Sequence, residues 1–107
     1  MEKRQLGNSD LLITPVGFGA WAIGGSWEYG WGPSDDQESI GAIQRALDCG
    51  VNWIDTAPAY GLGHSEEIVA KALRDRTDRP YIFTKCEIRW NPDSSLYYSL
   101  KADSVRQ

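Results

Sequence analysis

The chain has 107 residues, of which 41% are hydrophobic and 24% are charged, a composition typical of one soluble globular domain. Fifteen Asp and Glu residues outnumber eleven Lys and Arg residues, so the formal net charge is -4, and no basic run offers a track for phosphates. These features argue against a disordered chain and against nucleic acid as a partner.

The cysteines and the apolar segments favour a cytoplasmic protein without a membrane anchor. Cys49 and Cys86 are too few for a disulfide framework and lack metal-ligand spacing, so we expect reduced thiols and no metal site, with a single bridge as the alternative. The stretch "LLITPVGFGAWAIGG" is broken by Pro15 and four glycines, and it is shorter than the roughly 20 residues of a membrane span. Because Glu2 and Asp10 are acidic where a signal peptide is basic, we do not expect secretion.

A hairpin and a first strand are predicted at the start of the chain. Residues 3–13, "KRQLGNSDLLI", are two short extended pieces joined at Gly7 and Asn8, which tolerate the positive φ of hairpin turns. Residues 16–21, "VGFGAW", are apolar and rich in glycine, which predicts a strand whose end enters an aromatic loop.

A helix and a second strand are predicted next. Ser34 precedes Gln37 by three residues, which is the spacing of a capping box, so a helix should begin here. Apolar residues recur at helical spacing after it, and Gly50 lies where a left-handed cap ends a helix. The apolar run 51–55 therefore predicts a strand that follows this helix directly.

The same order is predicted once more. A second helix should begin near Ser65, where two glutamates suit the helix dipole, and should end by residues 77–80. Residues 81–84, "YIFT", predict a third buried strand. A loop containing Trp90 should then lead to a third helix near Leu100.

Apolar strands that alternate with amphipathic helices predict an α/β fold with a parallel sheet, because parallel strands need crossover connections. No repeat beyond this alternation and no low-complexity segment is found. Residues 1–107 are therefore expected to belong to a single domain.

Several chemically distinctive residues follow the ends of the predicted strands. The C-terminal ends of parallel strands face the same way, so Trp21, Asp55 and Lys85 should emerge on one rim. If the strands that carry Asp55 and Lys85 are neighbours, they lie about 4.8 Å apart, near enough for the Lys85 ammonium to pair with the Asp55 carboxylate. Tyr60 lies on the loop that leaves Asp55, so its hydroxyl can fold back over that rim.

A phenol beside an ammonium is suited to proton donation, because the positive charge favours the phenolate that remains. Asp55 would hold the ammonium of Lys85 in place and keep it charged despite partial burial. Such a phenol can give a proton to a carbonyl oxygen while hydride reaches the carbon. No side chain is a hydride donor, so this chemistry requires a nicotinamide or a similar cofactor.

These residues resemble the N-terminal signatures of the aldo-keto reductases, NADPH-dependent carbonyl reductases built on a (β/α)₈ barrel. In order along the chain, the matching stretches are "GFGAW", "DTAPAYG", "GHSEE" and "TKC". The opening hairpin is similar to the one that plugs the bottom of the family's barrel. The resemblance implies an α/β fold of an N-terminal hairpin and the first three βα units of a TIM barrel, with parallel strands and an incomplete barrel in this chain.

The resemblance also implies a role for each residue. Tyr60 is expected to be the general acid, Lys85 its charged partner and Asp55 the residue that pairs with Lys85, in an NADPH-dependent reduction of aldehydes or ketones to alcohols. The residues expected near the nicotinamide and its ribose are Gly19, Ala20, Trp21 and Asp55. The residues expected to line an apolar pocket for a small carbonyl substrate are Trp21, Trp31 and Trp90.

Part of the family's pattern is expected to lie beyond Gln107. A complete barrel has roughly 250 residues, so about three of its eight units are present, and the family's catalytic histidine at the end of the fourth strand is missing. His64 is not expected to replace it, because it lies where the second helix opens and should bond a backbone group there. Open sheet edges would leave the isolated 107-residue chain marginally stable or self-associated. The chain alone is expected to be inactive, because the fourth-strand histidine and most of the cofactor site are absent from it.

The sequence leaves other functions open. The chain is alternatively a structural segment, a partial barrel that associates through its edges and catalyses nothing. The loop from Trp27 to Trp31 is alternatively a carbohydrate platform, or a loop that packs Trp27 and Tyr29 on each other. "GFGAWA" also satisfies the dinucleotide fingerprint, but the glycines after Ile23 oppose the helix that such a site requires. Cys86 has no general base nearby and is expected to be a packed thiol.

Overall fold

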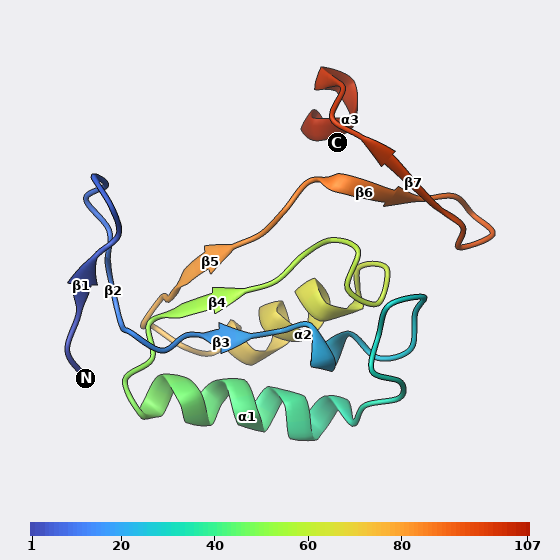
Figure 1. The fold of residues 1–107 in the computed structure, drawn as a ribbon. Coiled ribbons are helices and arrows are strands. Elements are labelled where there is room, and N and C mark those ends of the chain that lie inside the picture. The colour runs from blue at the N-terminus through green and yellow to red at the C-terminus, as the bar shows by residue number, and fades with distance from the viewer.

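The computed structural model describes residues 1–107 and contains three separate sheets and two long helices (Figure 1). The strands are β1 (Arg4–Gln5), β2 (Leu12–Ile13), β3 (Phe18–Gly19), β4 (Trp53–Asp55), β5 (Tyr81–Phe83), β6 (Glu87–Trp90) and β7 (Leu96–Ser99). The helices are the 3₁₀ turn η1 (Ala22–Gly24), α1 (Asp36–Asp48), α2 (His64–Leu73) and the short α3 (Ala102–Arg106). None of these helices combines the length and the apolar character that a membrane span requires.

The central sheet has the strand order β3-β4-β5, and both strand pairs are parallel. Helix α1 connects β3 to β4, α2 connects β4 to β5, and both helices lie on the same side of the sheet (Figure 1). The prediction of parallel strands joined by helices is therefore confirmed. The N-terminal hairpin is confirmed as well, since β1 and β2 pair antiparallel and Gly7 in the turn has a φ of 55°.

One hydrophobic core lies between the sheet and its helices. Ile54 of β4, Ile43 of α1 and Ile68 of α2 are all fully buried in this core. Side chains alternate along a strand, so Trp53 and Asp55 point to the face that the helices do not cover. Packing of Ile54 in the core therefore fixes β4, and Asp55 lies at the C-terminal end of this strand on the face that the helices leave open.

Helix α1 is capped by a different residue from the one predicted. The prediction of Ser34 as the cap is wrong, because the side chain of Asp35 accepts the hydrogen bond from the Glu38 amide at 2.9 Å. A carboxylate caps a helix as well as a hydroxyl does. The Ser34 hydroxyl donates instead to the Ile23 carbonyl in η1 at 3.4 Å, which anchors the loop before the helix. Gly50 has a φ of 99° and follows the last turn, as predicted.

Strand β5 is not buried, and the prediction of a third buried strand is wrong on that point. Tyr81 is 38% exposed and Ile82 is 43% exposed. The strand is an edge of the sheet, with β4 on one side and no strand on the other. The apolar run of β5 is typical of a strand that is covered on both faces, which is why burial was predicted. In this structure no other element covers these side chains of β5.

Residues 87–99 form a hairpin where the sequence predicted a loop. Strands β6 and β7 pair antiparallel, and the Asn91 amide donates to the Ser95 carbonyl at 2.9 Å to close the turn. The hairpin lies beyond the C-terminal end of β5 and away from α1 and α2 (Figure 1). The turn residues "NPDSS" between segments rich in Trp and Tyr are typical of a hairpin, so the prediction of a loop was wrong.

Candidate active site

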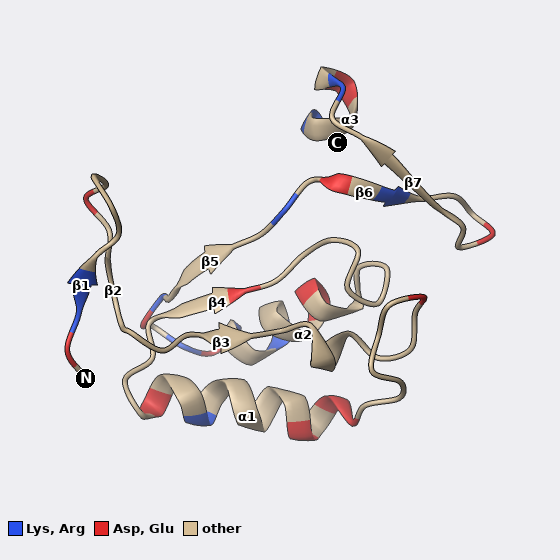
Figure 2. Cartoon of the chain, viewed as in Figure 1, with Lys and Arg blue, Asp and Glu red and all other residues tan.

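Asp55 and Lys85 meet at the C-terminal edge of the parallel sheet. Asp55 is the last residue of β4, and Lys85 lies two residues after the end of β5. The Lys85 ammonium donates to Asp55 Oδ1 at 2.6 Å and to the Thr56 carbonyl at 2.9 Å. Figure 2 shows the acidic end of β4 and the basic segment that follows β5. The contact follows from parallel pairing, which brings the C-terminal ends of β4 and β5 to the same edge.

Tyr60 faces the same ion pair from the loop after β4. The Lys85 Nζ lies 5.0 Å from the centroid of the Tyr60 ring. Two turn hydrogen bonds hold the loop, from the Tyr60 amide to the Ala57 carbonyl at 3.2 Å and from the Gly63 amide to the Pro58 carbonyl at 2.7 Å. The structure thus brings together the carboxylate, the ammonium and the phenol, which we call the trio.

The ammonium of Lys85 is held in its charged form. Partial burial lowers the pKa of Lys85, but the hydrogen bond to Asp55 and the neighbouring Tyr60 phenol raise this pKa more, so the net shift is upward. A raised pKa means that the base holds its proton more tightly, so Lys85 is positively charged at neutral pH. The side chains of Lys85 and Asp55 are 46% and 45% exposed, which leaves the pair accessible to a ligand.

A cavity of about 200 Å³ opens beside Tyr60 and Lys85. Its lining residues are Trp27, Ala57, Pro58, Ala59, Tyr60, Lys85, Cys86, Glu87 and Ile88. The ring centroids of Trp27 and Tyr60 are 6.0 Å apart, so Trp27 forms the wall next to the phenol. A mostly apolar cavity with a phenol and an ammonium on its wall can bind the carbonyl group of a small molecule in a fixed orientation.

Trp27 is a cavity residue that sequence reasoning did not assign to the site. The tryptophans expected there lie elsewhere: Trp21 and Trp31 are both exposed and contact each other with ring centroids 6.0 Å apart, and Trp90 is on β6 outside the cavity lining. Trp27 also packs edge to face on Tyr29, with ring centroids 5.7 Å apart, which is the self-packing alternative for this loop. No spacing rule in a glycine-rich loop indicates which aromatic side chain turns toward the site.

The residues expected near a nicotinamide differ in their access to a ligand. Ala20 is fully buried in the core, so its side chain offers no surface. Gly19 pairs with Asp55, and a Cβ placed at Gly19 would meet no atom within 4 Å. Trp21 is 44% exposed. Gly19, Trp21 and Asp55 are therefore accessible to a ligand. Ala20 packs in the core behind them.

Two side chains make contacts that differ from those predicted. His64 begins α2, and its Nε2 lies 2.7 Å from the carboxylate of Asp36 in α1, so it does not bond a backbone group. The prediction failed because this partner comes from the other helix. Cys86 is exposed and lines the cavity, so the prediction of a packed thiol is wrong, although both cysteines are free as expected.

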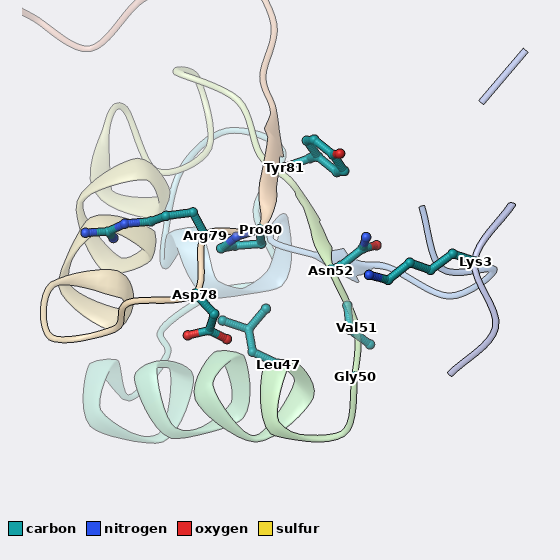
Figure 3. A pocket seen from close by; sticks show the side chains of 9 residues that line it. All are labelled: Lys3, Leu47, Gly50, Val51, Asn52, Asp78, Arg79, Pro80 and Tyr81. Atoms are coloured by element: carbon teal, nitrogen blue, oxygen red, sulfur yellow. The ribbon is translucent and has the colours of Figure 1, made fainter. Parts of the chain in front are cut away.

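A larger cavity, of about 330 Å³, lies at the opposite end of the sheet (Figure 3). Its lining residues are Lys3, Leu47, Gly50, Val51, Asn52, Asp78, Arg79, Pro80 and Tyr81. Most of them belong to the turns that enter β4 and β5, whereas the trio lies where the strands end. We therefore assign this cavity no part in the chemistry of the trio.

Known proteins are similar to this chain in sequence and in fold. Residues 15–107 match the Aldo/keto reductase family. The aldo-keto reductase YhdN of Bacillus subtilis is 38% identical over 100% of this chain and 32% of its own length. The NADH-specific methylglyoxal reductase of Escherichia coli is 39% identical over 100% of this chain and 36% of its own length.

Solved structures agree with the sequence match. An aldo-keto reductase from Bacillus halodurans in its holo form superposes with a TM-score of 0.84 at 28% identity, over 99% of this chain and 33% of that one. The glycerol dehydrogenase of Gluconobacter oxydans has a TM-score of 0.80 at 34% identity, over 98% of this chain and 32% of that one. This chain spans about a third of the length of these relatives and matches roughly the first third of their TIM barrel, with a parallel sheet that does not close. The chain therefore belongs to the aldo/keto reductase family.

Proposed function

We propose that this chain carries the proton-donating part of the active site of an NADPH-dependent oxidoreductase that reduces aldehydes or ketones to alcohols. The observation that carries the proposal is the meeting of Asp55, Lys85 and Tyr60 beside an apolar cavity. Residues 1–107 are then the N-terminal portion of a single barrel domain. Membership of the family supports the reaction class.

Each member of the trio has its own role in this proposal. The Tyr60 hydroxyl gives its proton to the carbonyl oxygen of the substrate. The Lys85 ammonium, 5.0 Å from the ring centroid, stabilises the phenolate that remains. Asp55 orients that ammonium through a charge-assisted hydrogen bond of 2.6 Å. A bound nicotinamide supplies the hydride.

The residues beside Asp55 fit a flat nicotinamide ring. The space above Gly19 is open, and a side chain at this position would enter it. Trp21 is partly exposed at the same edge of the sheet. We assign contacts with the nicotinamide and its ribose to Gly19, Trp21 and Asp55. The Escherichia coli relative is described as NADH-specific, so binding tests of this assignment compare NADPH with NADH.

Lys85→Met tests the role of the ammonium in a completed chain, which joins residues 1–107 to the part of Bacillus subtilis YhdN that they do not match. We expect kcat to fall by about 10²-fold or more, because the phenolate left after proton donation loses its neighbouring charge. The free energy of unfolding should fall by about 1 kcal/mol or less, because the ion pair is half exposed. The measurements are the rate of NADPH oxidation and urea unfolding.

The matched control for this test is Lys71→Met, which removes an exposed lysine on α2. Its kcat should equal that of the parent chain. Normal turnover in the Lys85→Met chain contradicts the role proposed for the ammonium.

Self-association of a partial barrel without catalysis is the second candidate function. An apolar groove of about 240 Å³ lies between α2 and the open edge of β5, lined by Thr56, Glu66, Val69, Ala70, Leu73, Ile82 and Thr84. Under this candidate, sedimentation of the 107-residue chain shows a mass that rises with concentration, and Ile82→Lys abolishes the rise by placing a charge in the groove. Tight binding of NADPH by the same chain contradicts this candidate.

A further inference from the structure

We propose that Ser65 is a positioning residue, which fixes the geometry of the trio through buried hydrogen bonds; this proposal rests on the roles given to the trio above. Ser65 lies in the first turn of α2 and is 0% exposed. It is not among the residues that line the cavity beside Tyr60, so it acts through its neighbours and not on a substrate.

The Ser65 hydroxyl takes part in two buried hydrogen bonds. It donates to the Ala20 carbonyl at 3.0 Å, and it lies 2.9 Å from the Thr56 hydroxyl. Because a serine has a single hydroxyl proton, which goes to Ala20, Thr56 must be the donor in the second bond. Ala20 and Thr56 are 0% and 1% exposed, so bulk water does not reach them to replace the hydrogen bonds of the Ser65 hydroxyl.

Backbone hydrogen bonds link this cluster to Tyr60 and Asp55. The Ser65 amide donates to the Tyr60 carbonyl at 3.1 Å, which fixes the end of the loop that carries the phenol. The Ala20 amide donates to the Asp55 carbonyl at 2.8 Å, which ties the end of β3 to the end of β4. Ser65 therefore holds two strand ends and the Tyr60 loop at one point.

The link to Lys85 runs through Thr56. The Thr56 carbonyl is the second acceptor of the Lys85 ammonium, at 2.9 Å, beside the carboxylate of Asp55. Removal of the Ser65 hydroxyl leaves a buried hydroxyl and a buried carbonyl without partners, and the strand ends must shift to relieve this. A shift of Thr56 moves its carbonyl away from the ammonium.

An NMR titration of the lysine Cε signals in the 107-residue chain tests the proposal without substrate or cofactor. The four lysines are Lys3, Lys71, Lys85 and Lys101, so Lys85→Arg assigns the Lys85 signal and the other three serve as references. The pKa of Lys85 lies above its ordinary value of 10.5 in the parent chain. In Ser65→Ala we expect this pKa to fall toward 10.5, by more than the scatter of the three reference lysines.

Substitutions at Thr56 and a second buried serine complete the design. Thr56→Val should lower the pKa of Lys85 as Ser65→Ala does, and Thr56→Ser, which keeps the hydroxyl, should restore it. The control is Ser39→Ala, since Ser39 is 6% exposed on α1 and donates to the Asp35 carbonyl at 2.9 Å. The Ser39→Ala substitution should lower the free energy of unfolding and leave the pKa of Lys85 unchanged.

The outcomes separate this proposal from a general loss of stability and from the proposed function. An unchanged pKa of Lys85 in Ser65→Ala, or an equal fall in Ser39→Ala, overturns the positioning role. If Ser65→Ala does not fold, the Thr56 pair decides, and equal Lys85 pKa values in Thr56→Val and Thr56→Ser overturn it. The titration does not depend on turnover, so a failure of the proposed reaction would leave this result intact.

Discussion

Tyr60→Phe in the completed chain is expected to lower kcat for carbonyl reduction by about 10²- to 10⁴-fold, which is the contribution typical of a general acid. The substitution removes one oxygen atom and keeps the ring, so the packing on Trp27, at 6.0 Å between centroids, is retained. Binding of NADPH should change little, because Tyr60 is not among the residues assigned to the nicotinamide. Steady-state rates and the Kd of NADPH, from tryptophan fluorescence, measure the two effects.

Tyr81→Phe is the control for this substitution. Tyr81 begins β5 and lines the cavity at the other end of the sheet, so loss of its hydroxyl should leave kcat unchanged. Near-normal turnover in Tyr60→Phe would show that another group donates the proton, and the assignment of the general acid would be wrong. An equal loss in both variants would instead indicate a defect in folding.

Gly61→Ala is expected to lower the free energy of unfolding by about 2 to 5 kcal/mol, the combined effect of left-handed backbone strain and overpacking. Gly61 has a φ of 64°, and a Cβ at this position would lie 1.8 Å from the Gly24 carbonyl oxygen. Both partners in this contact are backbone, so no side-chain rotation can relieve the clash. The loop after β3 and the loop after β4 must separate, and Tyr60, the preceding residue, moves with its loop.

Gly7→Ala is the matched control, because Gly7 has a similar φ of 55° and a Cβ there would meet no atom within 4 Å. Only the backbone strain remains in this variant, so we expect a loss of about 1 to 2 kcal/mol. Urea unfolding of the parent chain and both variants gives the comparison. If the two variants lose the same free energy, the two loops do not touch in solution.

The order of the elements was predictable because the signals for it act over a few residues. The apolar periodicity of helix α1 and the turn residue Gly7 depend only on neighbours in the chain, and the structure confirms both. The hairpin of β6 and β7 has a similar local signal in its turn residues "NPDSS", so this hairpin was also predictable from the sequence. The exposure of Ile82 had no local signal, because it depends on what lies beside β5.

The approach of Asp55, Lys85 and Tyr60 to one another was predictable because it follows from topology. Parallel strands end at the same edge, so Asp55 and Lys85, at the ends of adjacent strands, meet there, and Tyr60 reaches them through the loop that leaves β4. The catalytic roles of the trio remain predictions. The wall of the cavity was not predictable in this way, since Trp27 is one of several aromatic residues in a loop whose path is set by packing.

The amino-acid pattern was therefore sufficient for the alternation of strands and helices and for the edge where Asp55 and Lys85 emerge. Periodicity acts over a few residues, and strands joined by helical crossovers run parallel and end at one edge. Packing between segments distant in the chain decided the remaining contacts, such as the Thr56–Ser65–Ala20 hydrogen bonds and the bond of His64 to its acidic partner. These contacts exist because backbone and side chains of different loops come within a few ångströms of each other. Such distances are set by the whole core and leave no periodic trace in the sequence.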